Sequence, residues 1–403
     1  MTTITAKVIG APAENSLDRP VFANGRSNMT YQCPEGIELF ERQQDREAQR
    51  GESSSVDNLE VRALSSLSDP EWDSMALSHP ESNLFHRTAW GRVVCKTYGH
   101  TPLYLDFRRN GKSIALIPMV ELASPITGKR GVSMPFSDFC SPLVFDAHGQ
   151  ESIVAALLKI GRERNWRSVE LRGGRNIMPA FAPAAEKYYT HRLNLSIGVE
   201  QLFDGLSPSA RRAVRKAEKS GVKAEVSESW EATREFYRLH ARTRRRHGLP
   251  PQPLSFFRNI HREIIRQGFG FVVLAKLGPR PIAGALFFHS KQTGLYKFGA
   301  SDERESRLRG NNLAIWQGIK ELAQNGITTL DFGRTDFQNS GLRDFKLSWG
   351  ATEGITEYFR FSFRADKWLA GTNQTSKLHE AIFRRLPVVV NRIAGRLIYP
   401  HLD

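Results

Sequence analysis

The stretch NNLAIWQGIKELAQNGITTLDFG, residues 311–333, decides the fold, because an earlier stretch has the same order of elements. It predicts a helix with one apolar face, followed after a glycine by a strand. ESIVAALLKIGRERNWRSVELR, residues 151–172, predicts the same pair. Glu170 in the first stretch matches Asp331 in the second, at an offset of 161 residues. The chain therefore contains an internal repeat.

The sequence on either side extends this repeat. In each half we expect a strand, two helices, three strands, a helix and a strand. The first half offers strands at 59–64, 101–107, 113–122, 131–145, 168–171 and 188–195, with helices opened by Asp69 and spanning 87–99 and 151–166. The second offers strands at 222–226, 269–277, 281–289, 295–301 and 327–333, with helices at 229–248 and 253–268 before the one in 311–333. Each helix has one apolar stripe that a sheet must cover, so we predict an α/β (α+β) fold with a mixed sheet flanked by helices in each half.

The domain organisation follows from length and composition. A chain of 403 residues is too long for one ordinary core. We predict a disordered leader at 1–57, two repeat domains at 58–199 and 200–364, and a C-terminal helical tail at 365–403. The leader is rich in Gln, Glu, Arg and Ser and has no sustained period.

Charge and cysteine content narrow the function classes. With 57 basic and 42 acidic residues the net charge is +15, which favours partners that carry phosphate or an anionic surface. Cys33, Cys95 and Cys140 are odd in number and lack metal-binding spacing, so neither a disulfide framework nor a metal site is expected. We see no signal peptide and no apolar run of membrane-spanning length, and we expect a cytoplasmic protein.

Two stretches carry a family resemblance, SPSARRAVRKAEKSGVKAEV at 207–226 and DFGRTDFQNSGLRDFKLSWG at 331–350. Together with the doubled order of elements, they resemble the FemAB-like and BioF2-like tandem GNAT acyltransferases. The likeness covers about residues 60–400 and is greatest to the FemAB-like proteins found beside exopolysaccharide and PEP-CTERM sorting genes. It implies two tandem GNAT-like domains. The long helical arm that some members insert into the second half is missing here.

The resemblance implies a reaction as well as a fold. An acyl or aminoacyl group would pass directly to an amine of a cell-envelope or exopolysaccharide precursor, in the cleft between the two halves. The donor would be an acyl-CoA such as acetyl-CoA, or an aminoacyl-tRNA, with tRNA then a partner. No metal is implied.

The segment GLRDFKLSWG, residues 341–350, is similar to the FKxxFG-like motif of the family, with Trp349 in place of the second Phe. The resemblance places Phe345 and Lys346 at the acyl-transfer site. A fixed ammonium group there would stabilise the oxyanion that forms when an amine attacks an ester or thioester. The alternative is an amphipathic helix on which Lys346 faces water.

Asp138 is the candidate for acid–base work. It lies among apolar residues in MPFSDFCSPL, residues 134–143, where burial would raise its pKa toward a useful value. The alternative is an Asp that only caps a turn. Glu170 and Asp331, which match in the repeat, are expected to anchor strand ends.

Candidate phosphate ligands come from three places. The turn before 311–333 places Arg307, Gly310 and Asn312 in the positions of the GNAT pyrophosphate signature, although Asn312 stands where a small residue is usual. Asn311 or Asn312 would cap the helix, whose N-terminus suits an anion. Bidentate guanidinium groups are expected from Arg334 and Arg343.

The third place is the basic helix that begins at Ser207, where Arg211 and Arg215 share a face. This face could follow a tRNA or a lipid-linked pyrophosphate, or it could simply be solvated.

The tail KLHEAIFRRLPVVVNRIAGRLIYPHLD, residues 377–403, is basic and amphipathic. One alternative is peripheral contact with the inner membrane surface, and the other is docking on the second half through the same apolar face. A rival function is a non-catalytic protein that binds phosphate or nucleic acid, or an envelope scaffold, that retains the fold. The Phe345–Lys346 motif argues against the rival, and the oligomeric state is not predicted.

Overall fold

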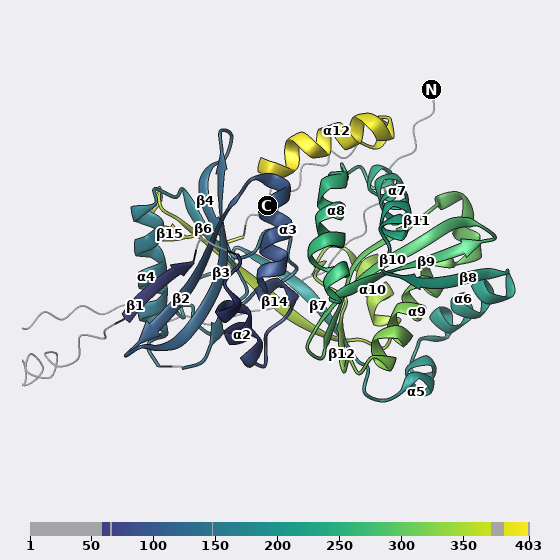
Figure 1. Ribbon diagram of the computed structural model, residues 1–403, viewed down its shortest axis with the longest axis horizontal. Helices are drawn as coiled ribbons and strands as arrows, with labels where there is room; N and C mark the ends of the chain where they lie inside the picture. The colour runs from purple at the N-terminus through teal and green to yellow at the C-terminus, as the bar shows by residue number, and fades with distance from the viewer. Residues whose placement is uncertain (1–58, 65–66, 147, 372–382, 402–403) are drawn as a thin grey trace, which may run out of the picture. The chain divides into compact units, whose positions relative to one another are not determined.

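The computed structural model describes residues 59–64, 67–146, 148–371 and 383–401 (Figure 1). The predicted leader and Cys33 lie outside the described residues. The elements of the first half are β1 (Leu59–Leu64), α2 (Pro70–Ser78), η1 (Leu84–His86), α3 (Thr88–Tyr98), β2 (Thr101–Arg109), β3 (Lys112–Ser124), β4 (Gly128–Val132), β5 (Leu143–Val144), α4 (Gln150–Glu163), β6 (Ser168–Arg172) and β7 (Glu186–Asn194).

The second half follows with more helix. Its elements are α5 (Val199–Asp204), α6 (Pro208–Lys219), β8 (Val222–Ser227), α7 (Trp230–Arg246), α8 (Leu254–Glu263), η2 (Ile265–Gln267), β9 (Gly270–Leu277), β10 (Arg280–Ser290), β11 (Thr293–Ser301), η3 (Glu303–Leu308), α9 (Gly310–Gln324), β12 (Thr329–Asp331), β13 (Thr335–Asp336), α10 (Ser340–Leu347), β14 (Thr352–Ser362), β15 (Lys367–Trp368), α12 (Val388–Ile398) and η4 (Tyr399–His401).

The order of these elements confirms the predicted repeat. The series β1, α2, α3, β2, β3, β4, α4, β6 recurs as β8, α7, α8, β9, β10, β11, α9, β12. One predicted strand, 131–145, is wrong: β4 ends at Val132, and before β5 the chain touches the sheet through a single bridge, from Cys140 to Arg172 of β6. Met134 and Phe136 adopt positive φ angles of 50° and 61°, which extended strands do not contain. The intervening Pro135 also lacks the N–H that a strand ladder needs.

Within the described residues all strands belong to one sheet, whose main path runs β1-β2-β3-β4-β6-β14-β7-β12-β11-β10-β9-β8. At the centre of this sheet the two halves exchange one strand each. β7, from the end of the first half, pairs with β12, whereas β14, from the end of the second half, pairs with β6. β7 and β14 pair with each other, antiparallel. Each half of the sheet is thus completed by a strand from the other, and the division at 199/200 stays a prediction.

A matched ion pair holds each exchanged strand. Glu170 on β6 lies opposite Arg360 on β14 in the register, and the Arg360 Nε lies 2.9 Å from a Glu170 carboxylate oxygen. Asp331 on β12 lies opposite Arg192 on β7, with the Arg192 Nε 3.3 Å from the carboxylate. Both acids are buried, and an unpaired charge at such a position would be costly. This arrangement supports the predicted structural role of both acids.

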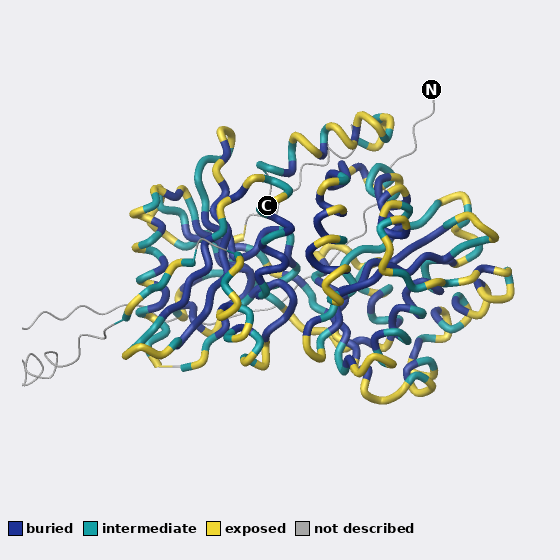
Figure 2. Tube along the Cα trace, viewed as in Figure 1, coloured by how far each residue is buried: buried dark blue, intermediate teal, exposed yellow. Residues whose placement is uncertain are grey.

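The two halves also share an apolar core. Trp90 of α3 packs edge-on against Phe256 of α8 and Phe288 of β10, with ring centroids 5.9 Å apart in each case. At the edge of this contact, Glu263 of α8 accepts hydrogen bonds from Arg92 and Lys96 of α3, at 2.9 and 3.0 Å. Figure 2 shows the buried residues running through the sheet and along the helix faces that cover it. The two halves are therefore joined by packed apolar side chains, with ion pairs at the edge of the contact.

Helix ends mostly follow the sequence signals. Asp69 caps α2 through the backbone N–H of Glu71, and Gly99 ends α3 in the left-handed conformation. The predicted capping of α9 by Asn311 or Asn312 is wrong. That helix begins one residue earlier, at Gly310, and its N-cap Arg309 has a φ of 58° and makes no side-chain cap.

The C-terminal helix α12 docks on the body of the protein, but the face predicted for docking is wrong. Its buried residues are Asn391 and Gly395, whereas Val389, Ile393 and Leu397 are exposed. A β-carbon at position 395 would lie 2.0 Å from the carbonyl oxygen of Pro251. Only glycine allows the helix backbone to come this close, so the helix docks through the face that carries Gly395.

Candidate active site

A cavity of about 560 Å³ lies where β11, α7, α10 and the loop after β4 meet. It brings together five residues that the sequence analysis singled out. They are Asp138, Asn311, Arg334, Phe345 and Lys346. Its other lining residues are Thr243, Arg246, His247, Tyr296, Lys297, Gly299, Ala300, Ser301, Phe332, Asn339, Gly341 and Leu342. Asp138 comes from the first half and all the others from the second.

Lys346 is buried, with 3% of its surface exposed. The short helix α10 that carries it is capped by the Asn339 side chain, which accepts a hydrogen bond from the Leu342 backbone N–H at 3.0 Å. The Lys346 ammonium donates to the carbonyl oxygens of Gly333 and Arg334, at 2.8 and 2.9 Å. The alternative of a water-facing Lys346 is therefore wrong. Burial lowers the pKa of Lys346 to about 8, although nearby carboxylates oppose the shift.

Phe345 is half-buried beside it and packs against the apolar core of the second half. Its ring meets the fully buried Trp349 edge-on, with centroids 6.0 Å apart. The aromatic pair fixes α10 on the sheet, so the position of Lys346 depends on Phe345.

Asp138 is held by a residue that the sequence analysis did not single out. The Lys297 ammonium lies 2.7 Å from the Asp138 carboxylate and also donates to the Phe136 carbonyl at 2.7 Å. Burial alone would raise the pKa of Asp138, but Lys297, with Arg334 and Lys346 behind it, lowers it. The prediction of a raised pKa is wrong, and Asp138 is a carboxylate at neutral pH.

Lys297 reaches this position through a β-bulge. Leu286 pairs with Phe298 and the next residue, Phe287, pairs with Tyr296, so Lys297 has no partner in the register. Bulges of this kind redirect a side chain and are common beside active sites. The sequence offers one signal for it, a lone lysine within the apolar run LYKFGAS of 295–301.

Arg334 lies between the exchanged strands. Its guanidinium carbon is 4.4 Å from the ring centroid of Tyr188 on β7 and 5.1 Å from that of Tyr358 on β14. Burial alone would lower the pKa of Arg334, but the two phenols and Asp138 raise it. The Tyr358 hydroxyl donates to the Asp138 carbonyl oxygen at 2.5 Å. Arg334 is a permanent cation in the cavity, placed by strands of both halves.

Other candidates lie away from this cavity. Arg343 bridges both oxygens of Glu353, at 2.6 and 2.9 Å. Arg211 faces Asp204 at 3.9 Å, and Arg215 covers the Phe203 ring at 5.3 Å. None of these three arginines lines the cavity.

The predicted pyrophosphate turn is only partly at the cavity. Asn311 lines it, whereas Arg307 is an exposed residue of η3 and Gly310 packs against Ile282 of β10. Asn312 lies in the first turn of α9, where its backbone N–H donates to the Arg309 carbonyl at 3.0 Å.

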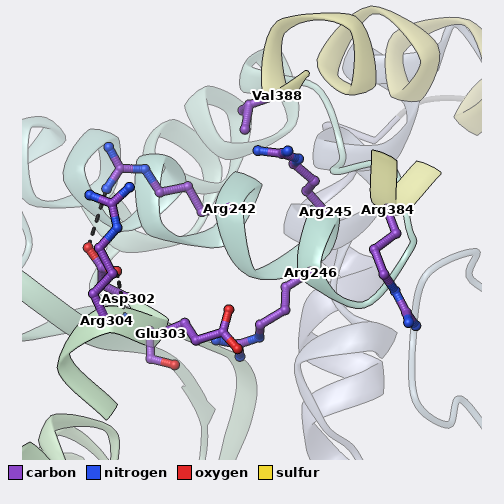
Figure 3. A pocket seen from close by; sticks show the side chains of 9 residues that line it. Arg242, Arg245, Arg246, Asp302, Glu303, Arg304, Arg384 and Val388 are labelled. Carbon is purple, nitrogen blue, oxygen red and sulfur yellow. Dashed lines mark hydrogen bonds and ion pairs between the residues drawn. The ribbon is translucent and has the colours of Figure 1, made fainter. Parts of the chain in front are cut away.

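A second, strongly basic hollow of about 650 Å³ adjoins the first, and we call it the arginine pocket (Figure 3). Its lining residues are Arg242, Arg245, Arg246, Ser301, Asp302, Glu303, Arg304, Arg384 and Val388. Arg246 and Ser301 line both spaces. Asp302 offsets part of the charge, since it lies 3.7 Å from Arg242. Guanidinium groups gathered in this way suit phosphate oxygens.

These residues fit the acyl-CoA that a GNAT-like fold implies. The cavity offers Lys346 and Arg334 to a polarised carbonyl, and the arginine pocket beside it offers cations to phosphates. The turn itself contributes less than the resemblance implies, because the N–H groups of Arg304 and Glu305 are bonded to Asp302 and that of Arg309 to Ser306.

Two searches of the described part of the chain were negative. Within residues 59–64, 67–146, 148–371 and 383–401, no group of three or more His, Cys, Asp or Glu side chains could hold a metal ion. No helix in these ranges is long and apolar enough to cross a membrane. Cys95 and Cys140 are free thiols whose pKa values burial raises.

Comparison with known proteins agrees with this fold. Residues 208–347 match the family described as "Acetyltransferase (GNAT) domain". The crystal structure of FemX is similar over 74% of this chain and 96% of that one, with a TM-score of 0.59 and 18% identity. A tandem GNAT protein from the clavulanic acid biosynthesis pathway is similar over 76% and 98%, with a TM-score of 0.52 and 10% identity. No curated protein has a matching sequence.

Residues 208–347 thus match a GNAT domain, and the chain has a fold similar to those of FemX and of the tandem GNAT protein. These likenesses support an acyl- or aminoacyltransferase in general. They leave the donor and the acceptor open.

Proposed function

We propose that the protein is an N-acyltransferase that moves an acyl or aminoacyl group onto an amine of a phosphate-bearing cell-envelope or exopolysaccharide precursor. The observation that carries this proposal is Lys346, a buried ammonium that lies in the segment matching the GNAT domain, is fixed by two backbone carbonyls and lines the cavity. Attack by an amine on the acyl carbonyl forms the C–N bond and places negative charge on oxygen. When this intermediate collapses, the bond to the donor's sulfur or oxygen breaks, and the leaving group departs with the proton that the amine loses. A cation held rigidly in a cavity stabilises that charge without having to reorganise.

The cavity provides different groups for the two partners of this reaction. Lys346 and Arg334 are the cations that we assign to the carbonyl oxygen. Asp138 is the only carboxylate that lines the described cavity, and we assign it to the attacking amine, whose N–H it can accept. Because its pKa is lowered, Asp138 acts here as a hydrogen-bond acceptor that orients the amine rather than as a strong base.

We propose an acyl-CoA as the donor, with its phosphates near the arginine pocket. Two features favour this choice over aminoacyl-tRNA. The match of 208–347 is to an acetyltransferase family, and the arginine pocket joins the cavity through Arg246 and Ser301. The acceptor follows from the FemAB-like resemblance and from the cationic surroundings of the cavity.

The test is direct binding of the purified full chain to acetyl-CoA and, separately, to a charged tRNA, at several salt concentrations. We expect saturable binding of acetyl-CoA that persists at high salt, whereas nonspecific phosphate attraction falls steeply as salt rises. Binding of tRNA without coenzyme A would assign the donor to the aminoacyl class. Binding of neither would contradict the proposed function and favour a scaffold that retains the fold.

A further inference from the structure

The C-terminal helix α12 is fixed on one side. Tyr399, just after the helix, donates to the Pro250 carbonyl at 3.0 Å and accepts from Arg244 at 2.9 Å. Within the helix, Asn391 donates to the Phe383 carbonyl at 2.7 Å and Arg392 to the Tyr237 hydroxyl at 2.9 Å. These contacts set which way each face of the helix points.

The opposite side of α12 is apolar and exposed. Val389, Ile393 and Leu397 are 65, 57 and 64% exposed, and their spacing of four residues puts them on one stripe. At 100° per residue, Ile393 and Leu397 lie opposite the buried face of Asn391 and Gly395. Val389 and Ile393 also border a hollow of about 800 Å³ that they share with Leu254 and Arg258 of α8. Figure 2 shows exposed residues recurring along the helix. An amphipathic helix normally buries its apolar stripe, and α12 does the reverse.

Arginines border the stripe. Arg396 follows on its edge, Arg385 precedes the helix, and both are exposed. No ion pair is formed by either residue within the described ranges, and residues 383–401 contain no Asp or Glu. The helix therefore presents an apolar strip with uncompensated positive charge alongside it.

This combination identifies the partner. A second copy of the chain would bring arginines together without any acid from the same segment, and one short helix is far below the roughly 20 to 30 residues a side of a stable protein interface. An anionic bilayer satisfies both features, because apolar side chains enter its interface and its headgroups attract arginines.

We propose that the exposed face of α12, formed by Val389, Ile393, Leu397, Arg385 and Arg396, binds the surface of an anionic lipid bilayer. The helix lies parallel to the membrane while its other face stays docked. Val388, the first residue of α12, and Arg384, four residues before it, line the arginine pocket. Membrane contact therefore puts that pocket beside the lipid headgroups, where precursors linked to lipid are found. The binding surface itself does not depend on the proposed function.

The experiment is cosedimentation of the full chain with vesicles of phosphatidylcholine alone and of phosphatidylcholine with about one third phosphatidylglycerol. We expect about tenfold stronger partitioning onto the anionic vesicles, and a loss of at least about tenfold in the double variant I393S/L397S. The control F181S removes an apolar residue that is even more exposed, at 80%, from the loop between β6 and β7, and should bind like the unchanged protein.

Two further variants and measurements complete the test. R385E/R396E should lose the preference for anionic vesicles, and the thermal unfolding midpoint of every variant should match that of the unchanged protein, since none of these side chains is buried. Equal sedimentation of I393S/L397S and F181S would overturn the proposal. So would a change from dimer to monomer in I393S/L397S by light scattering, which would assign the face to a second copy.

Discussion

The two halves of this protein share the same order of helices and strands but differ in two segments. The side chains of the candidate site come largely from these two segments. In both halves a strand pairs in parallel with the strand that carries the buried acid: Val132 with Glu170, and Leu295 with Asp331. Beyond that point β4 leaves the sheet and its loop carries Asp138, whereas β11 continues and its bulge carries Lys297.

The second difference follows the acid-bearing strands. After β12 the chain forms α10 with Lys346, whereas the described residues 173–185 after β6 form only turns. The repeated elements thus form the scaffold, and the segments that differ between the halves carry the charged side chains of the candidate site. If this is correct, loss of Lys346 should change the transfer rate, whereas loss of the buried ion pairs should change stability.

Lys346→Met should have the largest effect. Removing the fixed ammonium should lower the transfer rate by about 10² to 10³-fold, as for loss of one oxyanion donor, with donor binding largely kept. The rate is measured as consumption of whichever donor binds. Lys216→Met, which removes an exposed lysine of α6, is the matched control and should react at the unchanged rate.

The pH dependence of the transfer rate should further test the role of Lys346. Burial lowers the pKa of Lys346 to about 8, so the ammonium form is lost as pH rises through that value. The rate should then fall about tenfold per pH unit above about pH 8. Lys346→Arg keeps its charge and should lack this falling limb, whatever its rate. A falling limb that persists in the arginine variant would assign the titration to another group.

Lys297→Met should remove the charged side chain that the bulge of β11 adds to the frame shared by the two halves. The change leaves Asp138 without its ammonium partner, and we expect a loss of roughly 2 kcal/mol or more in unfolding free energy. Asp138→Asn with Lys297→Met should cost less than the two single changes added together, measured by guanidinium unfolding. Simple additivity would mean that the pair is not coupled.

The two buried acids should respond differently to pH. Burial opposes the shift, but Arg172 and Arg360 lower the pKa of Glu170, so its stabilising contribution is present at neutral pH and is lost as pH falls through the folded pKa. Burial raises the pKa of Asp331, so its contribution moves in the opposite direction and weakens as pH rises. Glu170→Gln should therefore destabilise more at pH 7 than Asp331→Asn. Thermal unfolding from pH 4 to 7 checks the order.

Arg343→Ala should have the smallest effect on catalysis. Its side chain pairs with Glu353 and does not line the cavity, so the transfer rate should change by less than about twofold. A loss of transfer rate as large as that of Lys346→Met would mean that Arg343 does contribute to the candidate site.

Much of the fold could be predicted, because the repeat is visible as apolar periodicity and glycine signals. The strand exchange could not be predicted, since the alternation of polar and apolar residues shows which face of β7 or β14 is buried but not which strand pairs with it. The apolar residues of 133–142 predict a strand, but they pack in a turn with positive φ angles at Met134 and Phe136 instead of in a ladder.

The site was predicted where a motif was local. Phe345 and Lys346 lie in one short segment, and the structure brings them to the cavity. The error over the pKa of Asp138 has one cause: its partner Lys297 is 159 residues away in the chain and reaches it through a bulge. Arg343 was singled out for phosphate, but its nearest acid, Glu353, takes both of its hydrogen bonds.

The central claim is that one site is assembled from both halves, and hydrogen exchange with saturating donor tests it most directly. We predict slowed amide exchange in two stretches distant in sequence, 133–142 of the first half and 333–347 of the second. Slowing confined to the basic helix α6, or to one half alone, would contradict a site where the two halves meet.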